Sequence, residues 1–206
     1  MTDDALVAAL VELEHHVGTA GWDQPARLFA LVRNDELVEA EPELAAHFGV
    51  HSSADGFPEG ALSSIEQDDF RSVGAGENAD TGLGESVASE SGLPQVLARI
   101  MWPDAVAGCA LALERSFLPS RFEVDLPEDP VAAERFVAEH PERQDLRLVV
   151  GVLRTGAAYC LARLVDQPDD LISGTELAPG VVSALAATLD GDHPGQRWHQ
   201  DTRRTC

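Results

Sequence analysis

The sequence contains no lysine, and all fourteen basic residues among its 206 are arginines. A lysine that forms a Schiff base with a substrate and the lysine of a phosphate-binding P-loop are therefore both excluded. The motifs GxSxG, GxGxxG, HExxH and CxxC are also missing; they mark nucleophile elbows, dinucleotide loops, and zinc or redox sites. No catalytic residue is predicted, and the sequence leaves open whether the protein is an enzyme.

Cysteines and long apolar runs are scarce as well. Cys109, Cys160 and Cys206 lie far apart in the chain, so the close pairs that a zinc site needs are missing. Cys109 and Cys160 fall inside apolar strand patterns, which predicts buried, reduced thiols. The acidic run 166–170 lacks the spacing and the glycine of an EF-hand calcium loop. No metal or other cofactor is predicted, and no apolar run of about 18 residues predicts a membrane span.

Positive charge is far outweighed, since 36 acidic residues give a formal net charge of −22. Such a field repels nucleic acid phosphates and anionic membrane surfaces, so neither is an expected partner. The N-terminus lacks the basic region and the continuous apolar core of a signal peptide, so we expect a cytoplasmic protein. The bias towards Ala, Gly, Val, Asp and Arg suggests a GC-rich genome.

The stretch from Asp145 to Val165 predicts the centre of the fold. Its residues alternate between two apolar faces, and Thr155-Gly156 supplies a two-residue turn, because glycine adopts positive φ without steric cost. A second long strand is expected at 104–117. Its small residues Gly108, Ala110 and Ala112 share one face and would let a helix pack close to the sheet. A further strand is expected at 27–33.

Helices are predicted at the N-terminus, at 93–100, at 131–140 and from Pro179 onwards, with a short one near Leu37–Phe48. The order α-β-α-loop-α-β-α-β-β-α indicates an α+β domain, with helices packed on an antiparallel sheet of about four strands. The layout resembles small sandwich folds of the secretion-chaperone-like kind, in architecture only.

Residues 1–190 are expected to form one domain. Residues 50–92 are rich in Ser, Gly, Asp and Glu and are expected to form a long, partly disordered loop, because they can bury little apolar surface. Within this loop only 61–70 carries enough apolar residues to dock. Residues 191–206 show no periodicity and are expected to form a flexible tail.

Two tryptophan-containing turns are the candidate binding residues, because each lies at the start of a predicted strand. Their aromatic, acidic and basic side chains could converge on a ligand. Alternatively, both tryptophans cap the edge of the core and both aspartates cap turns. The candidate residues are Trp22, Asp23, Gln24, Arg27, Trp102 and Asp104.

Three blocks, GWDQPARLFALV, ARIMWPDAVAGCALALERSFLP and EHPERQDLRLVVGVLRTGAAYCLARL, resemble a family of uncharacterised single-domain actinobacterial proteins known mainly through structural genomics. The likeness covers roughly Leu6 to Leu189, apart from the loop at 50–92. It implies a cytoplasmic protein from a GC-rich source and brings no catalytic residues with it.

Two functions are carried forward from the sequence. The first is a non-catalytic binding or adaptor module for an apolar or basic protein or peptide segment. The second is a small-molecule-binding protein or enzyme with a site at the two tryptophan turns. A homodimer built on the sheet is also expected, with Arg147, Arg154 or Arg163 meeting acidic residues of the second copy.

Overall fold

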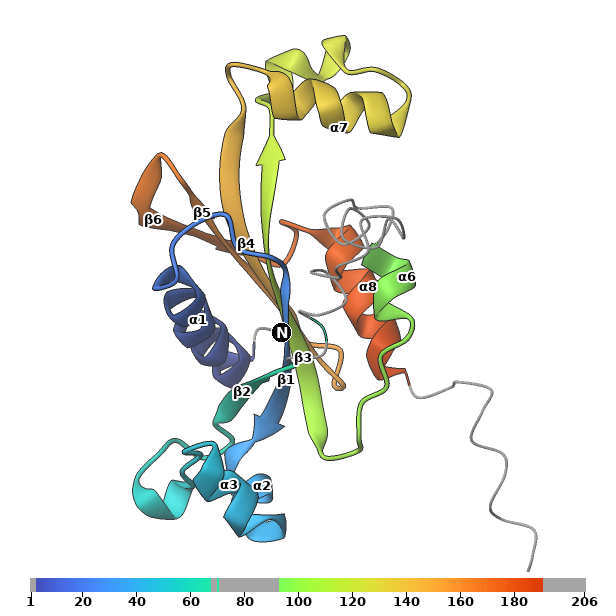
Figure 1. Ribbon diagram of the computed structural model, residues 1–206. Coiled ribbons are helices and arrows are strands. Elements are labelled where there is room, and N and C mark those ends of the chain that lie inside the picture. Colours follow the sequence, from blue (N-terminus) through green and yellow to red (C-terminus); the bar gives the residue numbers. More distant parts are fainter. Residues whose placement is uncertain (1–2, 68–69, 71–92, 191–206) are drawn as a thin grey trace, which may run out of the picture.

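The computed structural model describes residues 3–67, 70 and 93–190, and its centre is an open antiparallel sheet of six strands (Figure 1). The strands lie in the order β2-β1-β3-β4-β5-β6. Their bounds are β1 (Arg27–Arg33), β2 (Leu62–Glu66), β3 (Val106–Phe117), β4 (Gln144–Leu153), β5 (Ala158–Leu164) and β6 (Gln167–Gly174).

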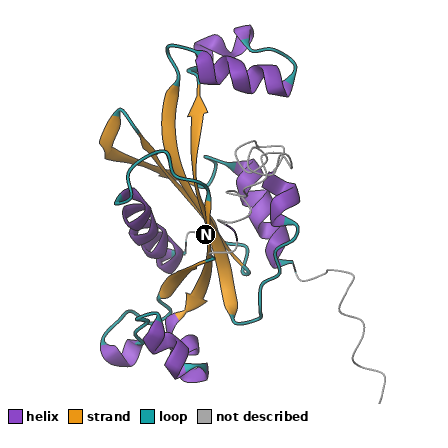
Figure 2. Ribbon diagram, in the orientation of Figure 1, coloured by secondary structure: helices purple, strands orange, loops and turns teal. Residues whose placement is uncertain are grey.

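Helices lie on both faces of this sheet and at both of its ends (Figure 2). The fold class is therefore α+β, as predicted. The helical elements are α1 (Asp4–Gly18), α2 (Asn34–Ala40), α3 (Pro42–His47), η1 (Ser53–Asp55), α6 (Leu93–Leu97), η2 (Ser120–Asp125), α7 (Pro130–Glu139) and α8 (Pro179–Leu189).

Helix α1 covers one face of the sheet. It begins at Asp3, whose carboxylate accepts a hydrogen bond from the Leu6 N–H and so caps the helix. The small residues predicted to allow close packing do so: Ala110 and Ala112 lie in the core under this helix. At Gly151 a Cβ atom would come within 2.7 Å of Leu10, so the helix packs directly against the backbone of β4.

Helices α8 and α6 cover the opposite face. The buried residues there include Leu111 of β3, Val150 of β4, Cys160 of β5 and Leu185 of α8. Alternate residues of β4 thus enter different cores, as the pattern of the sequence predicted.

Two helical lobes extend the molecule beyond these layers, one at each end of β3 (Figure 1). The α3 lobe, residues 34–60, connects β1 to β2 and contains α2, α3 and η1. Its core packs Leu37, Ala45 and Val50 against Val106 at the start of β3. The α7 lobe, residues 118–143, connects β3 to β4 and contains η2 and α7.

The prediction of about four strands was wrong, because both edge strands were missed. Strand β2 lies in the stretch that was assigned to the long loop, and β6 begins in a stretch that was interpreted as an acidic turn. The sequence of β6, QPDDLISG, contains a proline and two aspartates, which are tolerated and even favoured at an exposed sheet edge. Edge strands need to match only one neighbour, so their own apolar pattern is weak.

The turn between β4 and β5 has three residues rather than the predicted two. Leu153 pairs with Ala157, and the Gly156 N–H donates to the Leu153 carbonyl at 2.9 Å. Gly156 has φ 84°, which confirms the expected positive φ. A type I turn followed by a left-handed glycine matches strand twist in three-residue hairpin loops.

Two expectations fall largely outside the described residues. The disorder expected within 50–92 concerns mainly residues 68–69 and 71–92, and the tail expected at 191–206 is not described at all. Both stay predictions. In the described part of the loop, Ser53–Asp55 forms η1 and Leu62–Glu66 forms β2.

Candidate functional site

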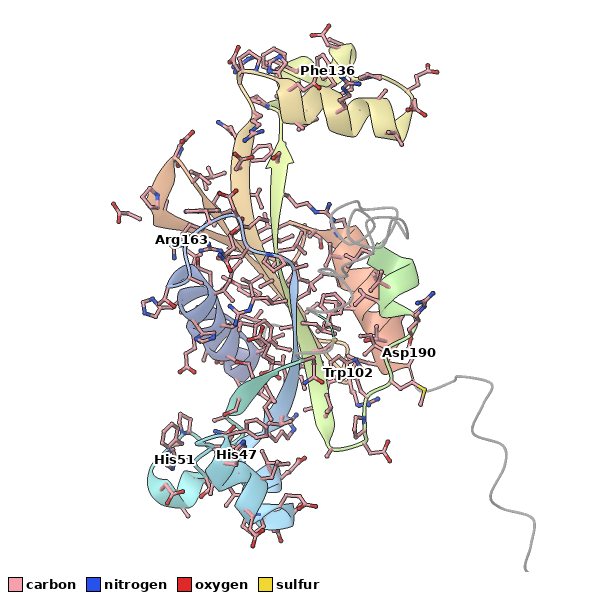
Figure 3. The ribbon with its side chains drawn as sticks, in the orientation of Figure 1. His47, His51, Trp102, Phe136, Arg163 and Asp190 are labelled. Atoms are coloured by element: carbon pink, nitrogen blue, oxygen red, sulfur yellow. The ribbon has the colours of Figure 1, made fainter. Side chains whose placement is uncertain are left out.

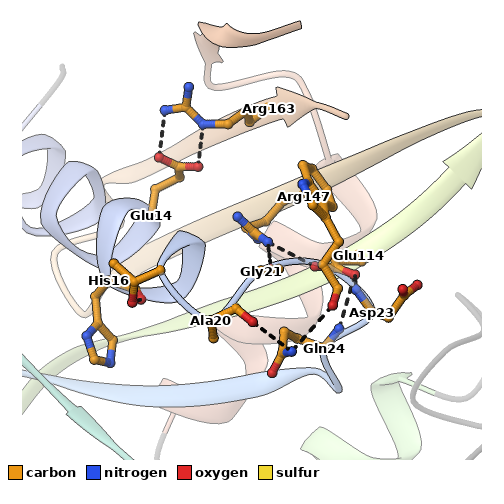
Figure 4. Close-up of polar contacts among 11 residues, drawn as sticks. Glu14, His16, Ala20, Gly21, Asp23, Gln24, Glu114, Arg147 and Arg163 are labelled. Atoms are coloured by element: carbon orange, nitrogen blue, oxygen red, sulfur yellow. Dashed lines mark hydrogen bonds and ion pairs between the residues drawn. The ribbon is translucent and has the colours of Figure 1, made fainter. Parts of the chain in front are cut away.

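A row of charged side chains crosses the α1 face of the sheet near the end of α1; Figure 4 shows Glu14, Glu114, Arg147 and Arg163 from this row. We call it the charged belt. The strands place these side chains side by side because each lies on the same face as the apolar residues under α1. Its members are Glu14 of α1, Arg27 of β1, Glu66 of β2, Glu114 of β3, Arg147 of β4 and Arg163 of β5.

Arg147 is the most buried arginine of the belt, with 2% of its surface exposed. Its Nη2 donates to Glu114 Oε1 at 3.1 Å and to the Gly21 carbonyl. The guanidinium carbon lies 4.4 Å from the ring centroid of Trp22, within the range of a cation–π interaction. A buried charge is tolerated only when it is paired and hydrogen-bonded, and these contacts supply both.

Glu114 also fixes the loop that leads from α1 to β1. Its Oε2 accepts hydrogen bonds from the backbone N–H groups of Asp23 at 2.7 Å and Gln24 at 3.2 Å. Asp23 adopts φ 62°, in the left-handed region that non-glycine residues rarely adopt. The carboxylate of β3 therefore holds an unusual backbone turn in place.

Two further pairs flank this centre. Arg163 and Glu14 form a two-pronged contact, with Nε to Oε1 at 2.6 Å and Nη2 to Oε2 at 2.8 Å. The hydrogen bond to Glu14 raises the pKa of Arg163. Arg27 and Glu66 form a second such contact at 2.7 and 2.5 Å, and His16 Nε2 lies 3.3 Å from Arg27 Nη2.

The belt is thus built from charges that are already paired within the chain. Each of its three arginines contacts a glutamate of the belt. A catalytic acid or base, by contrast, must exchange its proton with a substrate. We therefore interpret the belt as the border of the α1-face core.

The structure brings four of the six predicted site residues together and separates the other two. Trp22, Asp23, Gln24 and Arg27 lie at the belt. Trp102 and Asp104 precede β3, at the opposite end of that strand from Glu114. Eight residues of extended strand span roughly 26 Å. The six residues do not form one site; whether either group binds a ligand stays a prediction.

Trp102 has a structural environment of its own. Its indole N–H donates to Thr188 Oγ1 of α8 at 2.9 Å. The ring packs against the core of the α8 face and against the core of the α3 lobe. Trp102 (labelled in Figure 3) therefore joins the end of α8 to that lobe, and Asp104 beside it is exposed.

The three arginines of the predicted homodimer interface form ion pairs or hydrogen bonds with residues of their own chain. Arg147 and Arg163 pair with glutamates of the belt. Arg154 donates to backbone carbonyls, among them Val106 at 2.8 Å and Leu189 at 2.6 Å. The homodimer itself stays a prediction, but these contacts give no support to arginines reaching a second copy.

Sequence reasoning missed a surface on the α3 lobe. Three large apolar side chains are about half exposed there: Leu44 (43%), Phe48 (47%) and Phe57 (48%). Leu44 and Phe48 are four residues apart at α3 and its C-cap, so they share one side of it. Phe57 stacks on the imidazole of His51 with ring centroids 5.4 Å apart. We call these three residues the apolar surface of the α3 lobe.

The charge of the same lobe is one-sided. Residues 34–60 contain seven carboxylates and no arginine. Two of the carboxylates fix the lobe internally: Asp35 accepts from the Ser53 N–H at 2.6 Å, and Asp55 from the Ser52 N–H at 3.0 Å. These hydrogen bonds lower the pKa values of Asp35 and Asp55. The sequence could have pointed to this surface, because Leu44, Phe48 and Phe57 lie in a stretch that contains many acidic residues and no arginine.

The part of the chain that the structure describes offers neither a cluster of metal-ligating side chains nor a membrane-spanning helix. Within 3–67, 70 and 93–190, no three or more His, Cys, Asp or Glu side chains are grouped so that they could hold a metal ion. Over the same part of the chain, no helix is both long and apolar enough to cross a membrane.

The chain is similar to a known protein family. A family model described as PPA1309-like protein matches residues 6–190, which is most of the chain. Neither the curated proteins nor the solved structures contain a match.

Proposed function

The chain belongs to the PPA1309-like protein family, and we propose that it is a non-catalytic binding module for a basic, apolar segment of a partner protein. The segment would bind to the α3 lobe. The partner's apolar side chains would cover Leu44, Phe48 and Phe57, and its arginines or lysines would approach the surrounding carboxylates.

One observation carries this proposal: the apolar surface lies on a lobe with seven carboxylates and no arginine. Aromatic residues that can be buried by a partner are the usual anchors of protein interfaces. Acidic surroundings attract a basic partner over a distance and disfavour acidic ones, so they add specificity and speed of association. Single exposed apolar residues are common, but this acidic lobe carries three, and two of them share one side of α3.

The α7 lobe provides the internal comparison. It also contains seven carboxylates, but with three arginines. Each of those arginines pairs with a carboxylate of the chain: Arg121 with Glu142, Arg135 with Glu139, and Arg143 with Asp145. Its electrostatic attraction for a basic partner is therefore weaker, although Val124 and Val131 are exposed.

A small-molecule-binding protein or enzyme with a site at the tryptophan turns has less support. The two turns lie at opposite ends of β3, and the charges around Trp22 are paired within the chain. In this alternative the ligand would bind beside Trp22, Asp23 and Gln24, without Trp102 and Asp104.

Several features of the proposal rest on the sequence alone. A cytoplasmic location, an actinobacterial source and the likeness to secretion-chaperone-like architecture are all predictions from composition and element order. The absence of nucleic acid and membrane partners is expected from the net charge of −22.

The test is selection of peptides from a random library on the full-length protein. Selected peptides should combine Arg or Lys with Trp, Phe or Leu, and they should bind more weakly as salt screens the carboxylates. The double variant Phe48→Ser/Phe57→Ser should lose most of this binding. The control Val124→Ser/Val131→Ser alters two apolar side chains of the α7 lobe that are more exposed, at 89% and 74%, and should bind normally.

Val124→Ser/Val131→Ser should keep the urea midpoint of the parent protein, because both side chains are largely exposed. Phe48 and Phe57 are about half exposed, so binding by Phe48→Ser/Phe57→Ser is compared under conditions in which its urea curve shows it to be fully folded. The proposal is wrong if selection enriches no basic, apolar sequences, or if enriched peptides bind the Phe48→Ser/Phe57→Ser variant as well as the parent.

A further inference from the structure

We infer that the segment after α8, residues 191–206, is an internal ligand of the apolar surface of the α3 lobe. This inference rests on the proposed function, because it takes the same surface chemistry as its starting point. It goes further in naming an occupant within the chain and a consequence for the affinity of any partner.

The composition of this segment matches what the surface should bind. Its sequence is GDHPGQRWHQDTRRTC, with Arg197, Arg203 and Arg204 against two aspartates, a formal charge of +1. The whole chain carries −22, so the remaining 190 residues carry −23. Trp198 supplies a large aromatic side chain next to the first arginine. The segment is thus a basic, aromatic stretch attached to an acidic protein.

The structure places the start of the segment at the same end of β3 as the α3 lobe. Helix α8 ends at Leu189, whose carbonyl accepts from Arg154 Nη1 at 2.6 Å. The Nε of the same arginine donates to the Val106 carbonyl at 2.8 Å. Val106 is a member of the core of the α3 lobe. Asp190, labelled in Figure 3 near Trp102, therefore lies on the side of the molecule that carries this lobe.

Chain length does not limit the contact. The sixteen residues after Asp190 can span roughly 50 Å when extended. A short segment tethered to the molecule that carries its binding surface is present at an effective concentration in about the millimolar range. Even a weak contact between Trp198 and the apolar surface would then be populated within one molecule.

Charge favours the α3 lobe over the α7 lobe as the docking position. The α3 lobe contains seven carboxylates and no arginine of its own. One of them, Glu36, lies 3.6 Å from Arg33, the residue before the lobe. In the α7 lobe, Arg121 and Arg135 already take up Glu142 and Glu139. The α7 lobe also lies at the other end of β3, away from the end of α8 (Figure 1).

Occupation by the segment would lower the affinity for a partner. A partner can bind only molecules whose surface is free, so its apparent dissociation constant rises as the free fraction falls. Weakening the internal contact should therefore strengthen partner binding, without any change at the α3 lobe itself.

The experiment uses the full-length protein with a nitroxide spin label on Cys206. Cys109 and Cys160 are buried, so neither competes for the label in the folded protein. In the ¹⁵N-labelled protein, the label should broaden amide signals of residues 44–57 more than those of α7. Trp198→Ala/Arg203→Glu/Arg204→Glu should abolish this preference, and so should Phe48→Ser/Phe57→Ser. Val124→Ser/Val131→Ser should leave it intact.

A mixture of spin-labelled ¹⁴N protein with unlabelled ¹⁵N protein separates contacts within one molecule from contacts between two. Broadening of residues 44–57 in this mixture would show that a second copy supplies the segment and would overturn the internal contact. Equal broadening of both lobes, or none, in the singly labelled protein would overturn it as well.

Peptide binding separates this inference from the proposed function. Peptides selected on the α3 lobe should bind the Trp198→Ala/Arg203→Glu/Arg204→Glu variant about three- to tenfold more tightly than the parent. Equal affinities, with no preferential broadening, would remove the inference and leave the proposed function standing. Preferential broadening without any selected peptide would support the inference and remove the proposed function.

Discussion

On the α1 face of the sheet the apolar core is bordered by ion pairs, whereas on the α8 face the border includes neutral hydrogen bonds. The charged belt follows the strands where α1 ends, and Glu14 of that helix is part of it. On the other face Trp102 donates to Thr188, and the thiol of Cys109 lies 3.6 Å from the same hydroxyl. The strands are shared, so the difference comes from what covers them.

The side chains on each face of the strands correspond to the helix that packs over that face. Helix α1 ends at Gly18, where a Cβ atom would lie 3.2 Å from Arg147 Nη1. Beyond that point the long stems of the arginines cover the sheet, and their charges pair among themselves. On the α8 face Leu185 and Leu189 cover the strands, and Cys109 can be used as a small apolar residue. On the α1 face, the charged residues of the strands therefore lie where the covering helix ends.

The largest expected effect is at the centre of the belt. Arg147→Ala leaves the carboxylate of Glu114 without its ion-pair partner and removes the cation from the face of Trp22. We expect the free energy of unfolding to fall by about 4 kcal/mol, measured by urea denaturation. Arg135→Ala is the matched control, because its pair with Glu139 is exposed on α7, and its urea midpoint should stay close to that of the parent protein.

The double variant Glu114→Leu/Arg147→Met tests whether the loss of stability in Arg147→Ala comes from the unpaired carboxylate. Replacing both partners by apolar residues avoids the unpaired buried charge, so most of the lost stability should return. If the double variant were as unstable as Arg147→Ala, the belt would be needed for its specific hydrogen bonds to the 21–24 loop rather than for charge pairing.

On the α8 face the corresponding test is Leu185→Ala. Leu185 is fully buried, and its truncation removes apolar contacts and leaves a cavity. We expect a loss of about 3 kcal/mol in the free energy of unfolding. The loss should be independent of salt, whereas that of Arg147→Ala should shrink somewhat in high salt. Equal salt dependence of the two variants would remove the contrast between the faces.

The buried thiol of Cys109, on the α8 face, should make the free energy of unfolding depend on pH. Burial raises the pKa of Cys109 from 9.0 to about 11. Between pH 9 and about 11 the thiol ionises in the unfolded chain but stays neutral in the folded protein. Ionisation therefore favours unfolding in this range, and the folded protein keeps its full stability only below pH 9. The free energy of unfolding should fall by about 1.4 kcal/mol per pH unit there.

Urea midpoints measured between pH 8 and 10.5 test this slope, with Cys109→Ala as the reference. Cys160, whose pKa burial also raises, is present in both proteins and cancels in the comparison. Parallel pH profiles for parent and variant would mean that Cys109 does not titrate between pH 9 and 11.

The smallest expected effect lies in the turn that both faces share. Gly156 has φ 84°, and a Cβ atom there would meet no atom within 4 Å. Gly156→Ala should therefore cost about 1 kcal/mol through backbone strain alone. Gly151→Ala is a useful contrast, because its Cβ atom would press on Leu10 and Leu6, and we expect a larger loss, about 2 kcal/mol. Equal urea midpoints for Gly156→Ala and the parent would argue against strain at this turn.

The sequence by itself determined the elements that carry a strong pattern. The four central strands, both faces of β4, the caps of α1 and α7 at Asp3 and Asp129, and the positive φ of Gly156 were all predictable. Each depends on local alternation, on a capping side chain or on the freedom of glycine. The family likeness over the same part of the chain agrees with the match to residues 6–190.

Only the tertiary structure decided the edges, the pairing and the surfaces. Strands β2 and β6 form because a neighbouring strand offers hydrogen bonds, which no pattern within QPDDLISG or LSSIE records. Glu14 meets Arg163, 149 positions away, and Trp22 and Trp102 lie apart because antiparallel pairing of β1 with β3 places their starts at opposite ends. Leu44, Phe48 and Phe57 look like ordinary core residues in the sequence. Whether an apolar side chain is buried depends on which elements pack over it, and that is a property of the fold.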